Sequence, residues 1–268
     1  MTSDVDRQVD WPDGLPRSVT SVLLKGGMIC TTTLEQLADG REVVVKRCPY
    51  PAEVEAEGLL ALAAAGAPTP AVLGAVGHVL VLRYVQGPPA WAELGRAMAR
   101  VHRSTADRYG WYRDNPAGRF DQHNDWAADW PTFFVQRRIL VHLSDPAVPA
   151  DIADRLRRAC DGPLPALLPA HPPASLTHGD LWFGNVIDGR WIVDPAVCYA
   201  DRELDLAFMQ TGGLPDEVFD AYQREYPFAP GYEQRRPALQ LHKLLVGLRH
   251  FGPVRLPRIE AVLANYGW

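Results

Sequence analysis

The chain has 268 residues, of which 47% are hydrophobic, and a formal net charge of −5. This length is enough for one large core or for two lobes of ordinary domain size. The negative charge argues against nucleic-acid binding, the acidic N-terminus has no apolar segment typical of a signal peptide, and no run of about 18 apolar residues predicts a membrane span. We therefore expect a cytoplasmic protein that binds neither nucleic acid nor a membrane.

The four cysteines, Cys30, Cys48, Cys160 and Cys198, are far apart and form no Cys-x-x-Cys pair. Such spacing indicates neither a zinc site nor a disulfide framework. The eight histidines show no His-Glu-x-x-His spacing. We therefore predict no structural metal and no disulfide framework.

The N-terminal third predicts a small antiparallel sheet. Residues 1–16 are acidic and rich in proline and glycine, which indicates a loosely held entry segment. Turn signals at Gly26-Gly27 and Asp39-Gly40 separate the first three strand-like runs. The expected strands are 19–24, 28–34, 42–46, 72–73 and 79–82.

Lys46 ends the Val-Val-Val run of the third expected strand, where it is either a strand end that reaches solvent or a cation at a site. A helix is predicted over 51–66, because it starts at a proline and stops at a glycine. On its helical wheel Glu55 falls beside the leucines, whereas Glu57 falls on another face. A glutamate that faces the protein interior needs a partner for its charge, and Lys46, which precedes it in the sequence, is the candidate.

The remainder of the chain is predicted to be mainly helical, with helices at 91–102, roughly 150–168, one that starts within 199–207, and 239–251. Residues 109–134 interrupt this pattern with aromatic residues interleaved with amides and acids. Such a stretch is either a minor core or a wall that binds a sugar through aromatic faces and planar polar groups.

Three oxygen-bearing side chains, Asp180, Asn185 and Asp194, surround two short apolar runs. Residues 186–187 and 191–193 read as strands joined by an Asp-Gly hairpin turn. The hairpin would bring Asn185 and Asp194 together, with Asp180 one loop away. Such oxygens suit Mg²⁺ carrying phosphates, and the remaining carboxylate is free to accept a proton. A polar turn with surface acids is the simpler alternative.

Three features of this stretch occur in order: His178-Gly179-Asp180, then Asn185 five residues after the aspartate, then Asp194-Pro195. This order resembles the aminoglycoside phosphotransferase branch of the kinase-like phosphotransferases. Trp182, Gly184 and the run Val193-Asp194-Pro195-Ala196 are similar to the fructosamine kinase (ketosamine 3-kinase) family. The resemblance extends from about residue 26 to about residue 266.

The resemblance implies a two-lobed α+β protein kinase-like fold, with a nucleotide-binding lobe over 1–86 and a helical catalytic lobe over 87–268. It implies ATP and Mg²⁺ as cofactors. Asp180 would be the catalytic base, and Asn185 with Asp194 would hold the metal. Lys46, fixed by Glu55, would neutralise the phosphates, with Glu57 as the alternative partner.

Further site residues follow from the same resemblance. Backbone groups of Gly26 and Gly27 would cover the phosphates, and those of Arg83 and Val85 would pair with adenine. Some relatives have a redox-sensitive cysteine in the glycine loop; the matching position here is Met28, so a redox role of Cys30 stays open. The expected substrate contacts are Trp182, Glu203, Gln122, Asn124 and Trp126, and His178 and Asp205 are expected to support the site.

The implied acceptor is a ketosamine, a fructose, ribulose or erythrulose adduct of lysine or of a protein, phosphorylated at its 3-hydroxyl and thereby deglycated. An aminoglycoside or another amino sugar is the alternative acceptor. A regulatory pseudokinase that only binds nucleotide is the alternative of another class, although intact Lys46, Asp180, Asn185 and Asp194 argue against it. The expected oligomeric state is a monomer or a weak dimer.

Overall fold

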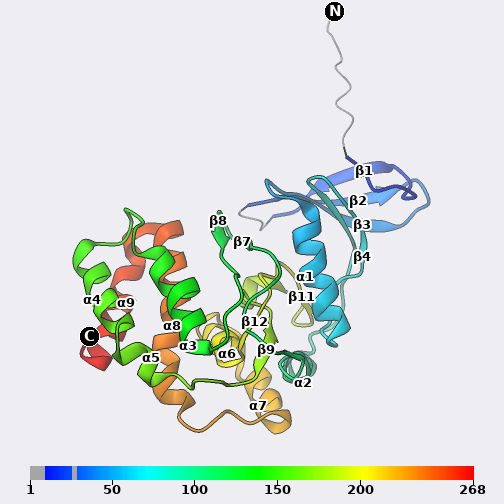
Figure 1. The fold of residues 1–268 in the computed structure, drawn as a ribbon. Helices are drawn as coiled ribbons and strands as arrows, with labels where there is room; N and C mark the ends of the chain where they lie inside the picture. Colours follow the sequence, from blue (N-terminus) through cyan, green and yellow to red (C-terminus); the bar gives the residue numbers. More distant parts are fainter. Residues whose placement is uncertain (1–9, 26–28) are drawn as a thin grey trace, which may run out of the picture.

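A five-stranded antiparallel sheet with one helix forms one lobe of the molecule, and a mainly helical region forms the other (Figure 1). The structure is a computed structural model that describes residues 10–25 and 29–268. The predicted two-lobed α+β arrangement is confirmed. Within the described residues, no helix combines the length and apolar character that crossing a bilayer would require.

The sheet has the strand order β1-β2-β3-β5-β4. All five predicted strands are present, and the Asp39-Gly40 turn has Gly40 at φ +87°. The second strand begins at Thr31, later than predicted, and the Gly26-Gly27 turn lies outside the described residues. The strands are β1 (Ser18–Leu23), β2 (Thr31–Leu37), β3 (Glu42–Arg47), β4 (Val72–Val76) and β5 (Val79–Arg83).

The two faces of the sheet have different covers. One face buries Val43 and Val45 beneath Trp11 and Leu15, so residues 10–16 are packed on the sheet and not loosely held as predicted. The other face packs Leu80 and Leu82 against α1 (Ala52–Ala64). Because side chains alternate along a strand, Lys46 lies on the α1 side of β3.

The second lobe is organised around one large core of aliphatic and aromatic side chains. The helix predicted over 150–168 is broken, because Gly162 leaves helical geometry and Pro163 starts a new helix. The last predicted helix is longer than expected and begins at Tyr232. The helices are α2 (Trp91–Val101), α3 (Trp130–Phe134), α4 (Ala150–Cys160), α5 (Pro163–Leu167), α6 (Glu203–Thr211), α7 (Asp216–Glu225), α8 (Tyr232–Phe251) and α9 (Leu256–Tyr266).

Short strands position the loops between these helices. β9 (Ala174–Thr177) pairs with β12 (Cys198–Asp201) and β6 (Thr105–Ala106). β10 (Val186–Ile187) pairs with β11 (Trp191–Ile192), and β7 (Asn115–Ala117) pairs with β8 (Phe120–Gln122). The residues singled out by the sequence between 178 and 194 therefore lie between β9 and β12.

Cys30 and Cys48 form a disulfide, contrary to the sequence prediction. The pairing of Thr31 with Arg47 at the ends of β2 and β3 brings the two cysteines to a Cα–Cα distance of 4.3 Å. Their sequence spacing does not show this, because it depends on the register of two strands.

Candidate active site

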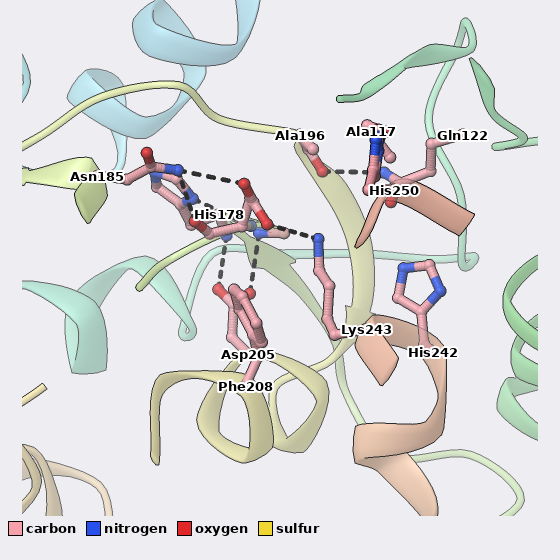
Figure 2. A network of polar contacts seen from close by, with 12 residues as sticks. Ala117, Gln122, His178, Asn185, Ala196, Asp205, Phe208, His242, Lys243 and His250 are labelled. Carbon is pink, nitrogen blue, oxygen red and sulfur yellow. Dashed lines mark hydrogen bonds and ion pairs between the residues drawn. The ribbon is translucent and has the colours of Figure 1, made fainter. Parts of the chain in front are cut away.

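The turn after β9 carries His178, Gly179 and Asp180, and a buried aspartate fixes its backbone. Asp205 in α6 accepts hydrogen bonds from the N–H groups of His178 at 2.6 Å and Gly179 at 2.9 Å (Figure 2). His102 Nε2 lies 3.3 Å from the same carboxylate. Burial acts to raise the pKa of Asp205, but hydrogen bonding to His102 and Gly179 outweighs it and lowers the pKa. Asp205 is therefore a buried anion that holds the turn.

The imidazole of His178 links the two segments of the site. Its Nδ1 accepts from the backbone N–H of Asp180 at 3.2 Å, and its Nε2 lies 3.1 Å from the carbonyl oxygen of Val193. These partners make Nε2 the protonated nitrogen. Burial lowers the pKa of His178 below its usual value, so the ring is neutral at pH 7.

Gly179 has φ +77°, a conformation that favours glycine. A Cβ at this position would lie only 2.0 Å from the carbonyl oxygen of Ala196. The N–H of Ala196 donates to the carbonyl of His178 at 2.8 Å. The glycine therefore lets the chain before Asp180 approach the chain after Asp194.

The hairpin between β10 and β11 has the predicted Asp-Gly turn, with φ +52° at Asp188 and +62° at Gly189. The N–H of Val193 donates to the carbonyl of Asn185 at 3.1 Å, which closes the outer end of the hairpin. The side-chain nitrogen of Asn185 lies 2.9 Å from the backbone oxygen of Asp180 and 3.2 Å from its Oδ2. The predicted gathering of Asp180 and Asn185 is therefore present.

Lys46 connects the sheet to this loop. Its Nζ lies 2.5 Å from Glu55 Oε1 and also pairs with Asp194 Oδ1. Burial acts to lower the pKa of Lys46, but the two carboxylates outweigh it and raise the pKa. Burial acts in the opposite sense on Asp194, where the lysine outweighs it and lowers the pKa. Lys46 is thus a buried cation, and Glu57, the alternative partner, pairs with Arg113 instead.

The oxygen atoms of Asn185 and Asp194 fit a hard divalent cation. Because the nitrogen of Asn185 donates to Asp180, its Oδ1 is the atom available to a metal. Asp194 has φ +57°, which is uncommon for a residue other than glycine and occurs at functional sites. Its side chain is 45% exposed, and its Oδ2 is the oxygen that does not pair with Lys46.

Two adjoining cavities meet at Asp180. A cleft of about 160 Å³ is lined by the predicted catalytic base, Asp180, and by residues predicted to bind nucleotide and metal: Lys46, Glu55, Asn185 and Asp194. A second cavity of about 470 Å³ lies beside α6 and α8, and both cavities are lined by Asp180 and Trp182. A group bound in one cavity can therefore reach a group bound in the other at Asp180.

Lys243 is a site residue that the sequence analysis missed. It reaches from α8 towards the loop that carries His178 and Asn185 (Figure 2). Its Nζ lies 2.8 Å from Asp180 Oδ1, and its side chain is mostly buried. A cation within the apolar stripe of 239–251 was the signal available in the sequence.

Trp182 lines both cavities and packs closely against two glycines, which leave space for it. A Cβ at Gly184 would lie 2.3 Å from the indole ring, and one at Gly212 would lie 2.7 Å from the tryptophan Cβ. The indole is 40% exposed. Its position fits the predicted contact with a substrate.

The structure gives the other predicted substrate contacts different surroundings. Gln122 is buried, and its Nε2 donates to Asn115 and to the Ala196 carbonyl, so it supports the wall of the cleft. Asn124 is fully buried and accepts a hydrogen bond from Arg138. Neither side-chain amide is available to contact a substrate in this structure, which corrects the prediction of substrate contacts. That prediction rested on local composition, which does not reveal these tertiary partners.

Two further substrate predictions are also revised. Glu203 is buried and paired with Arg235 through both carboxylate oxygens, at 2.8 and 2.6 Å. Trp126 is partly exposed and stacks on Tyr199, and it does not line either of the two cavities that meet at Asp180. In the described part of the chain, Glu203 is therefore engaged in an internal ion pair and Trp126 in aromatic packing.

The predicted adenine contacts lie at the end of β5 (Arg83) and just after it (Val85). The N–H of Arg83 donates to the carbonyl of Ala71 at 2.9 Å, so it is engaged within the lobe. The carbonyl of Arg83 and the backbone of Val85 remain the groups expected to face adenine. Gly26 and Gly27 lie outside the described residues.

The sequence profile described as fructosamine kinase matches residues 42–266. The chain belongs to the fructosamine kinase family. A probable ketoamine kinase of Lactiplantibacillus plantarum is 34% identical over 204 residues, 71% of each chain. A probable ketoamine kinase of Thermus thermophilus is 37% identical over 205 residues, 74% of this chain and 76% of the relative.

Solved structures give the same fold. A candidate fructosamine-3-kinase from Thermobifida fusca superposes with a TM-score of 0.85 at 30% identity, covering 94% of this chain and 95% of that chain. A macrolide 2′-phosphotransferase has a TM-score of 0.59 at 15% identity, covering 94% and 92%, which shows the kinase-like fold alone. As a member of the fructosamine kinase family, the chain is an ATP-dependent phosphotransferase.

Proposed function

We propose that this protein transfers the γ-phosphoryl group of ATP to the 3-hydroxyl of a ketosamine, a ketose carried on an amine. The acceptor would be a fructosamine, ribulosamine or erythrulosamine adduct of lysine or protein, and its phosphorylation would lead to deglycation. The observation that carries the proposal is the position of Asp180 where the cleft lined by Lys46, Asn185 and Asp194 meets the larger cavity. Membership of the fructosamine kinase family supports the choice of acceptor.

The transfer breaks the bond between the γ-phosphorus and the oxygen that leaves with ADP, and forms a bond from that phosphorus to the sugar oxygen. Asp180 orients the hydroxyl and accepts its proton. Lys46, held by Glu55, neutralises phosphate charge. Positioning and charge stabilisation of this kind dominate phosphoryl transfer.

Mg²⁺ would be held by Asn185 and Asp194, and it would neutralise the charge on the phosphates. A kinase of the same fold, the amicoumacin kinase solved with AMP-PNP and Ca²⁺, lends support to a nucleotide with a divalent ion. In the resting enzyme, Lys46 pairs with Asp194. That ammonium is positioned to move from the carboxylate to the phosphates when nucleotide binds.

We further propose that the nucleotide lobe ends near residue 86 and that the enzyme acts as a cytoplasmic monomer or weak dimer. The proposed use of ATP supports the cytoplasm as the compartment, because ATP is available there. Size-exclusion chromatography with light scattering would determine the oligomeric state, and a dimer that persists at nanomolar concentration would contradict it.

The test is a panel of acceptors with purified protein, ATP and Mg²⁺. Ribulose-lysine, erythrulose-lysine and fructose-lysine are compared with aminoglycosides and with no acceptor, and phosphorus–proton NMR locates the new phosphate. We expect phosphorylation at the 3-hydroxyl of at least one ketosamine. Turnover only with aminoglycosides would favour the alternative kinase, and nucleotide binding without turnover on any acceptor would favour a pseudokinase.

A further inference from the structure

The 470 Å³ cavity beside Asp180 has a cationic wall. Its lining includes Lys243 from α8, Arg255 from the turn after α8, and Arg258 from α9. Its volume falls in the range of about 300–1,000 Å³ typical of small-ligand sites. The cavity is therefore large enough for the part of an acceptor that lies beyond the reacting hydroxyl.

Arg255 has no acidic partner in the described part of the chain. Its Nε is buried without a hydrogen-bond partner among residues 10–25 and 29–268, and its guanidinium lies 5.5 Å from the centre of the Phe251 ring. Gly247 leaves room for it, because a Cβ there would lie 3.2 Å from Nε. No carboxylate of residues 10–25 and 29–268 forms an ion pair with this guanidinium, which lines the cavity and is therefore free to pair with an anionic ligand.

Arg258 also forms no ion pair within the described residues. By contrast, three arginines on α8 are paired: Arg235 with Glu203, Arg236 with Glu233 and Arg249 with Asp145. Arg255 and Arg258 therefore differ from the arginines of α8, because neither pairs with a carboxylate of the described residues.

The charges of the wall sum to +2, from the three cations and one lining carboxylate, Asp180. That carboxylate already pairs with Lys243, and the Nε2 of His250 lies 3.1 Å from the carbonyl oxygen of Ala117. The whole chain has a net charge of −5. A positive cavity in an acidic protein favours an anionic ligand.

We propose that Arg255 and Arg258 form a subsite for an anionic group at the non-reacting end of the acceptor, with the α-carboxylate of a glycated free amino acid as its ligand. The inference rests on the proposed function, because it assigns the far end of the same ketosamine. Arginine suits this role, since its planar fork binds a carboxylate through two parallel hydrogen bonds. A phosphate on the sugar shares this chemistry.

The test compares three acceptors: ribulose-lysine with a free α-carboxylate, its α-carboxamide, and the carboxamide that carries a 5-phosphate on the ribulose. We expect kcat/KM for the carboxylate to exceed that for the carboxamide by about 10- to 100-fold, as for one or two charge-assisted hydrogen bonds. In Arg255→Gln this ratio falls to near 1. Arg158→Gln, which removes an exposed arginine on α4, keeps the wild-type ratio.

Because the readout is a ratio within each variant, it does not depend on the fraction of folded protein. A wild-type ratio near 1, or a high ratio that survives Arg255→Gln, overturns the subsite and leaves the proposed kinase activity in place. If the phosphorylated carboxamide alone recovers efficiency, the cationic subsite stands and its anion belongs to the sugar. If no ketosamine is phosphorylated, the proposed function is wrong and this inference is wrong with it.

Discussion

Lys243 on α8 donates to the carboxylate of Asp180 at 2.8 Å, although 63 residues separate them. The contact ties the longest helix of the second lobe to the loop after β9. Since the lysine side chain is 11% exposed, the interaction is screened less than a surface ion pair. It therefore restricts the orientation of the carboxylate at the point where the two cavities meet.

We expect Lys243→Met to lower kcat by roughly 10- to 100-fold, because a misplaced catalytic group costs about this much. The KM for ATP should change little, since Lys243 lines the larger cavity and not the cleft that Lys46 lines. Lys243→Arg, which keeps the charge, should recover part of the rate. Steady-state kinetics with a thermal melt of each variant tests this, and a kcat within threefold of wild type in Lys243→Met would exclude the role.

Glu55 and Glu57 provide a matched pair on α1. Glu55→Gln removes the charged partner of buried Lys46, so we expect the KM for ATP to rise about tenfold or more. Glu57→Gln removes only the pair with Arg113, whose side chain is 42% exposed, and such pairs contribute at most about 1 kcal/mol. Nucleotide titration of both variants distinguishes the two positions. An equal loss in both would show that Glu55 has no special part in binding.

The raised pKa of Asp201 predicts that the stability of the protein depends on pH. Burial, reinforced by the charge of Glu203, raises its pKa to about 7. The folded state thus binds a proton that the unfolded state releases near pH 4, so this contribution to stability is complete below about pH 4 and is lost as the pH rises to about 7.

Asp201→Asn keeps the oxygen that accepts the Glu203 N–H and removes the titration. We expect the free energy of unfolding of the variant, relative to that of wild type, to increase by on the order of 1–4 kcal/mol as the pH rises from 4 to 8. Urea unfolding across this range measures the difference. A difference independent of pH would show that Asp201 titrates normally.

Local features of the site were predictable from the sequence. The Asp188-Gly189 turn requires positive φ at both residues, and this alone places Asn185 near the end of the hairpin. The inward position of Glu55 followed from the helical period. These features depend on a few neighbouring residues, which is why a single sequence reveals them.

Features that depend on distant segments were not predictable in this way. The Cys30–Cys48 disulfide requires the register of β2 against β3, and Lys243 meets Asp180 only after α8 packs beside α6. Asn124 has the composition of a sugar contact, yet Arg138 engages it in the core. Polar residues in an aromatic stretch therefore do not distinguish a binding wall from a buried network.

The role of Asp180 is the centre of this account, and one comparison tests it directly. Wild type and Asp180→Asn are assayed with ATP, Mg²⁺ and the best ketosamine acceptor, while ATP affinity is measured by titration. Because general-base catalysis contributes about 10²- to 10⁴-fold, we expect kcat of the variant to fall by that factor with ATP affinity within about threefold of wild type. Full turnover in Asp180→Asn would contradict the assignment of the catalytic base.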